Sequence, residues 1–391
     1  MRIVYVAYDR FPSSKGAAVH IDAFVSALAS SFGHVDLVTV PNDTFAGGQI
    51  ETRPYALGVT HTAIPVFGRN VIERALHFRR QLLHWWPARV DVAHVRSIFE
   101  GFPIAREKQR FCRQLVFEVN GLPSIELKYH YPDVADDREL LKKLRYQEDT
   151  CLAAADRVLT VSGVNAAYLV SRGVPRQKIR VIHNGVDTNL FTFRHARPGC
   201  DHLKLLYCGT LAAWQGVQLA MEALALYRRD FSAALTVVGE ARNRQLRDLE
   251  RQARRLDIAG HFQLLPPCSQ QELAALHHRH DVVLAPLRGN DRNLLQGCCP
   301  LKVLEAMSSG TPLISSDIPV VSELATNGRH AVMVKPGSAK AIKDGLLRLH
   351  GDPHFAGQLS AASRRHVLQH FTWQHAQGKL RQEYDSLTQI R

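Results

Sequence analysis

The sequence predicts an α/β protein made of two similar domains, each a parallel β-sheet covered by helices. Two observations carry this prediction. The chain of 391 residues is longer than one ordinary domain, and apolar strand-like runs alternate with helical patterns in two successive passes. A hydrophobic content of 46% and a charged content of 22% are typical of folded globular proteins, and they exclude extensive disorder.

The first pass begins with a short apolar run typical of a buried strand, followed by a loop that contains proline, serine and glycine. A helix is expected next, because Ile21, Phe24, Val25 and Leu28 recur at helical spacing. The strands expected in this pass are residues 2–8, 35–40, 90–94, 114–119 and 157–162, and the clearest helices are residues 19–30 and 137–155.

The second pass repeats this alternation after a turn signal at Asn184-Gly185, where we place the domain boundary. The domains are therefore expected to be residues 1–185 and 186–370. Open parallel sheets bind ligands beyond the carboxyl ends of their strands, so a site is expected in the loops that follow strands. The expected strands are residues 203–208, 235–238, 262–265, 282–284 and 313–315, and the expected helices are residues 217–227, 245–256 and 301–308.

The formal net charge of +13 is spread over both halves of the chain, with no basic tail. Such a charge suits nucleic acid, an anionic membrane or acidic substrates, but no nucleic-acid recognition motif accompanies it. The basic stretch at residues 69–113 contains Arg79, Arg80, Trp85 and Trp86, which suits an anionic membrane surface. The two tryptophans would also fit a protein core. Residues 242–255 are interpreted as a solvated helix face.

The seven cysteines show no paired C-x-x-C spacing, which indicates neither a zinc site nor a disulfide framework. No signal peptide or membrane-spanning run is recognised, so we expect a cytoplasmic protein, either free or peripheral at the inner face of the membrane. The histidine-rich run at residues 277–280 has no carboxylate at metal-ligand spacing and is interpreted as a surface helix end. We expect no bound metal and no cofactor.

Residues 292–314 are the most informative segment. Pro300 fits the first turn of a helix, and the small residues 297–299 before it allow a ligand to approach the backbone. Free N–H groups at a helix start suit a phosphate. Lys302 and Glu305 are three positions apart and share one helix face, where they would hold a diphosphate and a ribose diol. The alternative is a structural ion pair on an ordinary helix.

With this segment the chain resembles the family-four retaining glycosyltransferases (glycosyl transferases group 1), which have the two-domain GT-B fold. The sequence motifs that carry this resemblance are specific in their combined order and spacing, although each motif alone is weak. The segments that carry the resemblance are residues 15–18, 91–94, 179–187, 207–211, 237–240, 300–312 and 371–373.

The resemblance implies two Rossmann-like domains that face a central cleft. Residues 1–185 would bind the acceptor, residues 186–370 would bind the nucleotide sugar, and a C-terminal helix in residues 371–391 would pack back on the first domain. It also implies a retaining, metal-independent transfer from a nucleotide-diphosphate sugar (UDP- or GDP-linked) to a polysaccharide, lipid-linked or other glycan acceptor. GT-B enzymes use helix dipoles and cations to stabilise the leaving diphosphate.

The chain departs from the family pattern at three donor positions. Relatives carry a glutamate where this chain has Gly297, an arginine at Thr210 and a lysine at Gln215. The positive charge for a diphosphate must come from elsewhere, first from Lys302 and second from Arg292. The expected donor-binding residues are Gly16, Gly209, Thr210, Gln215, Arg292, Gly297, Cys298, Cys299, Pro300, Leu301, Lys302 and Glu305.

The catalytic candidates are Asn120 and Glu118. Relatives often carry a histidine at the strand end where Asn120 stands, and Asn120 would hydrogen-bond a sugar hydroxyl or a backbone carbonyl. Glu118 or Glu126 would orient the acceptor, unless Glu118 faces away in an alternating strand. His94 is interpreted as a core histidine, and His20 as a residue facing the cleft.

Two other functions compete with an active transferase. The departures at Gly297, Thr210 and Gln215 also suit a degenerate family member that binds a nucleotide sugar or glycan without turnover, as a partner of another transferase. A nucleic-acid-binding protein is motivated by charge alone, and we expect no nucleic-acid partner.

Overall fold

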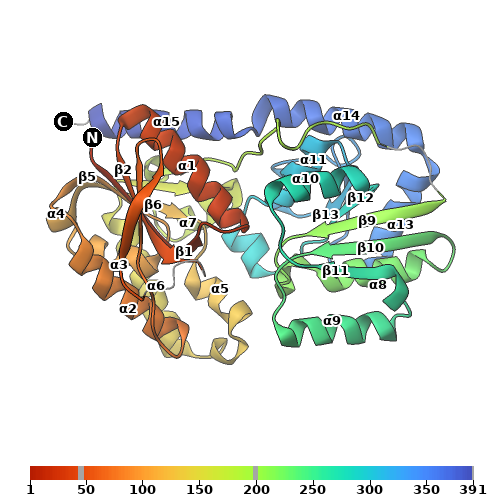
Figure 1. Ribbon diagram of the computed structural model, residues 1–391, viewed down its shortest axis with the longest axis horizontal. Coiled ribbons are helices and arrows are strands. Elements are labelled where there is room, and N and C mark those ends of the chain that lie inside the picture. The colour runs from red at the N-terminus through yellow and green to blue at the C-terminus, as the bar shows by residue number, and fades with distance from the viewer. Residues whose placement is uncertain (43–47, 197–200, 390–391) are drawn as a thin grey trace. The chain divides into compact units, whose positions relative to one another are not determined.

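The computed structural model of the chain describes residues 1–42, 48–196 and 201–389. Cys200, one of the seven cysteines, lies outside these residues. The chain divides into two compact units, which Figure 1 colours by residue number. Unit 1 comprises Met1–His183 and Ala376–Arg391, and unit 2 comprises Asn184–His375. The first division falls two residues before the expected Gly185/Val186 boundary, and the second lies inside the last helix.

Unit 1 contains an eight-stranded sheet with the order β3-β4-β2-β1-β5-β6-β7-β8. Its neighbouring strands pair in parallel, except that β3 runs antiparallel to β4. The strands are β1 (Ile3–Phe11), β2 (Val35–Pro41), β3 (Glu51–Ala56), β4 (Val59–Ala63), β5 (Val90–Val95), β6 (Cys112–Val119), β7 (Arg157–Thr160) and β8 (Ile179–Val181).

Strands β3, β4 and β8 of unit 1 were not predicted from the sequence. All six residues of β3 are exposed and one of them is Pro54, so this edge strand shows no apolar alternation. Strand β8 has three residues, which is too short for a periodic pattern.

The helices of unit 1 alternate with these strands along the chain (Figure 1). They are α1 (Gly16–Phe32), α2 (Val71–Trp85), α3 (Ile98–Arg106), α4 (Lys108–Phe111), α5 (Pro123–His130), α6 (Arg138–Ala154) and α7 (Gly163–Ser171). Four of them begin at a side-chain cap that was not predicted: Asn70 accepts from the Glu73 N–H, Ser97 from Phe99, Asp137 from Leu140, and Ser162 from Asn165. Each cap satisfies one of the free N–H groups at a helix start.

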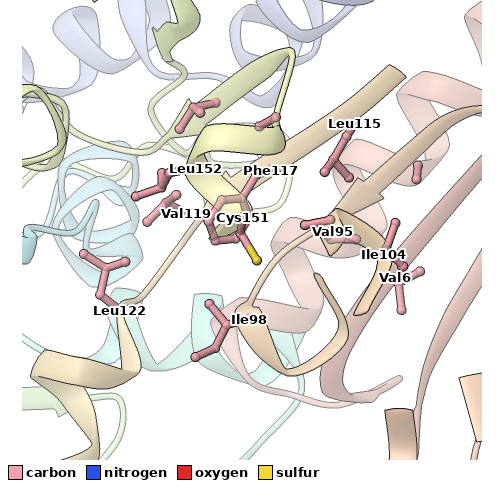
Figure 2. Close-up of a cluster of buried hydrophobic side chains, with 14 of the residues drawn as sticks. Val6, Val95, Ile98, Ile104, Leu115, Phe117, Val119, Leu122, Cys151 and Leu152 are labelled. Atoms are coloured by element: carbon pink, nitrogen blue, oxygen red, sulfur yellow. The ribbon is translucent and has the colours of Figure 1, made fainter. Parts of the chain in front are cut away.

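Apolar side chains from several of these elements pack together in the core of unit 1 (Figure 2). Val6 comes from β1, Val95 from β5, Phe117 from β6 and Ile104 from α3, and each is fully buried. Burying one such side chain stabilises the folded state by about 1.5–3 kcal/mol, so a cluster of this size holds the sheet and its helices together.

Unit 2 contains a six-stranded parallel sheet with the order β11-β10-β9-β12-β13-β14. Helices α8 and α9 lie on one side of it, and α10 and α11 lie on the other (Figure 1). The strands are β9 (His202–Cys208), β10 (Ser232–Val238), β11 (Phe262–Leu265), β12 (Val282–Ala285), β13 (Leu313–Ser316) and β14 (Val332–Val334). The α-helices are α8 (Val217–Tyr227), α9 (Asn243–Arg255), α10 (Gln270–Arg279), α11 (Leu301–Ser309), α12 (Pro319–Ser322), α13 (Ala339–Gly351) and α14 (Pro353–His370).

The order of the second sheet changes direction at β9. The chain adds β10 and β11 on one side of β9 and then adds β12, β13 and β14 on the other. Ligands of open α/β sheets bind beyond the carboxyl ends of the strands at such a switch point. The loop that follows β9, which begins at Gly209, occupies this position.

The last helix, α15 (Trp373–Gln389), begins in unit 2 and continues in unit 1. Within unit 1, Gln377 Nε2 donates a hydrogen bond to the carbonyl of Ala23 on α1, and the Tyr384 hydroxyl lies 2.7 Å from His94 Nδ1. The predicted α/β fold is confirmed, with two Rossmann-like sheets and a C-terminal helix returning to the N-terminal domain. None of the described helices is both long and apolar enough to cross a membrane.

Candidate functional site

Lys302 lies at the start of α11 and reaches the switch point of unit 2. Its side chain is 7% exposed, and its Nζ has no hydrogen-bond partner among the described residues. The same atom lies 4.3 Å from the centre of the Tyr207 ring, in a cation–π contact. Burial lowers the pKa of Lys302 to about 8, although the nearby Cys208 and Glu305 favour its charged form. A buried cation of this kind is costly unless a ligand pairs with it.

Gly209 allows the Lys302 side chain to lie close to the end of β9. Its φ of +128° suits glycine, and a Cβ placed on it would lie 2.9 Å from Lys302 Nζ. Glycine is therefore needed after β9 both for the turn and for the position of the lysine.

Glu305 lies one helical turn after Lys302, as the spacing predicted. Its side chain is 6% exposed, and burial raises the pKa of its carboxyl to about 7, while Lys302 opposes that shift. The pair combines one cation and one carboxyl in a nearly dry environment, where both interact strongly with a ligand.

Helix α11 starts at Leu301 as expected, but Pro300 is its N-cap and does not lie in its first turn. No side chain caps this end of the helix, so its first N–H groups are available to an anion. Gly297 has a φ of +73° and a ψ of 173°, a conformation that a glutamate at this position would not readily adopt. The backbone at this position therefore favours glycine.

The other expected donor residues of this segment have protein partners. Asn184 Nδ2 donates to the Cys299 carbonyl at 2.8 Å, and Cys299 itself is buried. Cys298 is half-buried. Arg292 Nη1 donates to the Gly297 carbonyl at 3.3 Å, and its guanidinium lies 5.6 Å from the centre of a Trp214 ring.

Thr210 and Gln215 lie on the loop between β9 and α8. Thr210 is exposed, and its carbonyl accepts a hydrogen bond from Tyr207 at 2.9 Å. Gln215 is half-buried, and its Oε1 has no hydrogen-bond partner within the described chain. Trp214, between them in the loop, is buried, as expected of a residue that packs the loop.

The interpretation of residues 277–280 as a surface helix end is wrong for His277, which is fully buried. Its Nε2 lies 3.9 Å from Cys208 Sγ, at the end of β9. One face of α10 is packed against the sheet, so consecutive histidines differ in burial. No local sequence pattern indicates that His277 and Cys208 meet, because they lie 69 positions apart.

Gly16, Asn120 and Glu118 belong to unit 1. Gly16 is exposed and is the first residue of α1, which no side chain caps. Asn120 is half-buried just after β6, and its Nδ2 donates to Glu118 Oε1. The Glu126 carboxylate approaches Gly121 so closely that a Cβ there would collide with it.

Glu118 is 1% exposed and lies at the centre of a buried polar network. Its carboxylate contacts His20 Nε2 at 2.7 Å, His94 Nε2 at 2.9 Å and Arg96 Nε at 3.2 Å. The Tyr5 hydroxyl also donates to it, at 2.9 Å. Burial alone would raise the pKa of Glu118, but His20, Arg96 and these hydrogen bonds hold it well below the ordinary range.

Two histidine interpretations are thereby tested. His94 is a core histidine as expected, since it is fully buried between Glu118 and Tyr384. The prediction that His20 faces a cleft is wrong, because its side chain is 2% exposed and pairs with Glu118. Tyr5 and Arg96 were not predicted from the sequence. Tyr5 lies in β1, and Arg96 directly follows β5.

Two families match the chain in series. Residues 14–190 match Glycosyltransferase Family 4, and residues 202–352 match Glycosyl transferases group 1. Among curated proteins, the chain is 28% identical to the glycogen synthase of Mycobacterium tuberculosis over 60% of its length. It spans 55% of the length of that relative.

Two further matches cover nearly the whole chain. The D-inositol 3-phosphate glycosyltransferase of Arthrobacter sp. is 27% identical over 92% of this chain and 87% of its own. A crystal structure of Anabaena HepE with UDP and glucose superposes with a TM-score of 0.74 at 14% identity. That likeness covers 99% of this chain and 100% of the other, and it supports the fold.

Proposed function

Because the chain belongs to the family-4, group-1 glycosyltransferases, we propose that it transfers a sugar from a nucleotide-diphosphate donor to a glycan or lipid-linked acceptor. The observation that carries the proposal is Lys302 Nζ, a buried cation without a hydrogen-bond partner in the described chain, placed beside Gly209 at the switch point. A diphosphate would supply the missing partner, and we propose that the donor sugar is linked to UDP or GDP.

In this proposal Lys302 and the first N–H groups of α11 bind the diphosphate, and Glu305 accepts hydrogen bonds from the ribose hydroxyls. Charge that develops on the leaving diphosphate is stabilised by a lysine and a helix N-terminus that are already in place. These groups would take the place of a divalent cation. Thr210 and Gln215 offer neutral hydrogen bonds where relatives have cations.

We propose retention of the anomeric configuration, with the leaving phosphate accepting the proton of the acceptor hydroxyl. No strong protein base is then required. Asn120 would hydrogen-bond a sugar hydroxyl in unit 1. Glu118, with both oxygens bonded inside the protein, would position Asn120 and would not contact the acceptor itself.

Thermal-shift titration with UDP, GDP and ADP tests donor binding, because a ligand of the folded state raises the melting temperature by mass action. Glu305→Gln should remove most of the shift given by the parent's best nucleotide, and the matched variant Glu222→Gln on α8 should retain it. An unchanged shift in Glu305→Gln would contradict the assignment. Nucleotide binding without donor hydrolysis or transfer would favour the degenerate, non-catalytic alternative.

For the acceptor side, we propose that the outer face of α2 contacts an anionic membrane. Ile72, Leu76 and Leu83 are 44%, 52% and 37% exposed and share this face with the exposed Arg80. Apolar side chains beside cations suit the headgroup region. Phe67, just before the helix, is 56% exposed.

Two parts of the basic stretch do not belong to this face. Arg79 donates hydrogen bonds to the carbonyls of Ile98 and Phe99, each at 2.7 Å, and burial lowers its pKa. It is therefore a structural residue. Trp85 and Trp86 are half-buried against the core of unit 1.

Flotation with phosphatidylglycerol vesicles at low salt tests the membrane proposal. Leu76→Asp should lower binding roughly tenfold, since one buried leucine contributes about 1.5–3 kcal/mol. Leu368→Asp on α14, at a leucine that is 45% exposed, is the matched control. Equal binding of both variants would reject α2 as the contact face.

A further inference from the structure

Three metal-ligating side chains meet beside the proposed donor site of unit 2. Cys208 ends β9, His277 lies on α10 and Glu305 lies on α11. One ligand atom from each lies within 4.8 Å of the other two, and the three side chains are 3%, 0% and 6% exposed. Elements distant in sequence thus bring a thiol, an imidazole and a carboxyl to one point.

The hydrogen bonds of His277 turn its Nε2 toward Cys208 Sγ, which lies 3.9 Å away. Its Nδ1 lies 3.3 Å from Ser309 Oγ, whose own proton goes to the Ala306 carbonyl at 3.0 Å. The Thr311 hydroxyl donates to the His277 backbone carbonyl at 2.9 Å. The arrangement assigns the ring proton to Nδ1, so the Nε2 lone pair points toward Cys208. A second hydrogen bond that fixes the ring in this way is typical of metal-binding histidines.

We propose that Cys208, His277 and Glu305 form a binding site for a zinc-type transition-metal ion. A thiolate and an imidazole favour zinc over magnesium or calcium, which prefer sets of oxygen ligands. Zinc bonds of about 2.0–2.3 Å need only a modest closing of the 3.9 Å between Cys208 Sγ and His277 Nε2. Three protein ligands leave a fourth position for water, as in open zinc sites.

Binding changes no oxidation state. The ion replaces the thiol proton of Cys208 and, where it is protonated, the carboxyl proton of Glu305, and both protons leave to water. The exposed Gly209 and Thr210 directly follow Cys208, so the ion has a short route from solvent.

The ion and the nucleotide should exclude one another, a consequence that rests on the proposed function. Glu305 cannot coordinate the ion and accept ribose hydrogen bonds with the same oxygen atoms. A second cation beside Lys302 would also repel the lysine from its position. Zinc would therefore act as a competitive inhibitor of donor binding.

Zinc chloride titrated into the nucleotide-free, full-length chain against a fluorescent chelator tests the site directly. We expect one tight ion per chain, and a loss of affinity of about 100-fold or more in Cys208→Ser. Cys112→Ser, at an equally buried free cysteine of unit 1, is the matched control and should bind zinc as the parent does.

Cobalt binding by the parent chain tests the site even if the Cys208→Ser variant fails to fold. Co²⁺ bound by the parent chain should show thiolate-to-metal charge-transfer absorption, and Cys112→Ser should show the same band. Absence of this band in the parent, or equal zinc affinity in the parent and folded Cys208→Ser, would overturn the site.

Addition of the nucleotide that gives the largest thermal shift should weaken zinc binding in proportion to its concentration. Zinc that binds through Cys208 but is indifferent to a bound nucleotide would overturn the mutual exclusion. A chain that binds zinc and no nucleotide would leave the metal site standing and reject the proposed function.

Discussion

Glu118 in unit 1 and Glu305 in unit 2 are both buried glutamates near the carboxyl end of a parallel strand, and each has a histidine and a cation nearby. Their partners differ. Glu118 receives donors from Tyr5, His20, His94, Arg96 and Asn120, and its pKa lies well below the ordinary range because these partners outweigh burial. Burial instead raises the pKa of Glu305 to about 7.

The two regions therefore use buried charge in different ways. A fully paired carboxylate is expensive to disrupt and stabilises one arrangement of its neighbours. The Lys302 ammonium group, without a hydrogen-bond partner among the described residues, costs stability in the free protein and gains its partner from a ligand. We therefore expect variants in unit 1 to affect folding and variants in unit 2 to affect binding.

The largest effect is expected from Lys302→Met. The loss of one pre-positioned cation for the diphosphate should lower kcat/KM for donor by about 100- to 1000-fold. Because methionine removes a buried charge, the melting temperature without ligand should stay the same or rise. Steady-state kinetics and thermal unfolding measure both, with Lys340→Met as the exposed control. A lower melting temperature together with normal kinetics would reverse the comparison.

The next effect is on the stability of unit 1. Glu118→Gln removes the carboxylate that pairs with Arg96 Nε, leaving Asp9 as the acidic partner of this buried arginine, and it should lower the free energy of unfolding by about 3–5 kcal/mol. Urea or thermal denaturation of the folded variant measures this loss. Glu305→Gln is the matched variant in unit 2 and should not be destabilised. Equal losses in the two variants would show that Glu305 is as well paired as Glu118.

The pH dependence of the melting temperature also tests the difference between Glu118 and Glu305. Burial opposes ionisation of Glu118, but His20 and Arg96 hold its folded-state pKa well below the ordinary value of 4.5. Its network therefore contributes stability above that ordinary value and loses it as the pH falls through the folded-state pKa. The melting temperatures of the parent and Glu118→Gln should differ most near neutral pH and converge in acid. A difference that stays constant down to acid unfolding would contradict the assignment.

The smallest effect is expected from Asn120→Ala. It removes one of five donors to Glu118 and leaves the others, so the free energy of unfolding should fall by only about 1 kcal/mol. Transfer to an acceptor should fall more than donor hydrolysis, because Asn120 is proposed to contact the acceptor. A loss of stability as large as that of Glu118→Gln would make Asn120 a structural residue.

Much of the fold followed from local pattern. The apolar runs at β1, β2, β9 and β13 and the helical spacing in α1 were recognised because each records burial within one element. Strands β3 and β8 were not recognised in the sequence, the first because it is exposed and the second because it is short. The pairing of Lys302 with Glu305 also followed from spacing, since three positions along a helix bring side chains to one face.

The two α/β passes, the family and the Lys302–Glu305 helix face can all be recognised in the sequence alone. Two features cannot: the enclosure of Glu118 by residues from β1, α1 and β5, and the meeting of Cys208, His277 and Glu305. The difference lies in the range of the contacts along the chain. Periodicity reports on neighbours within a turn or a pleat, whereas strand order and helix packing set contacts between residues far apart in the chain. The absence of metal-ligand spacing in the sequence therefore said nothing about ligands that three separate elements bring together.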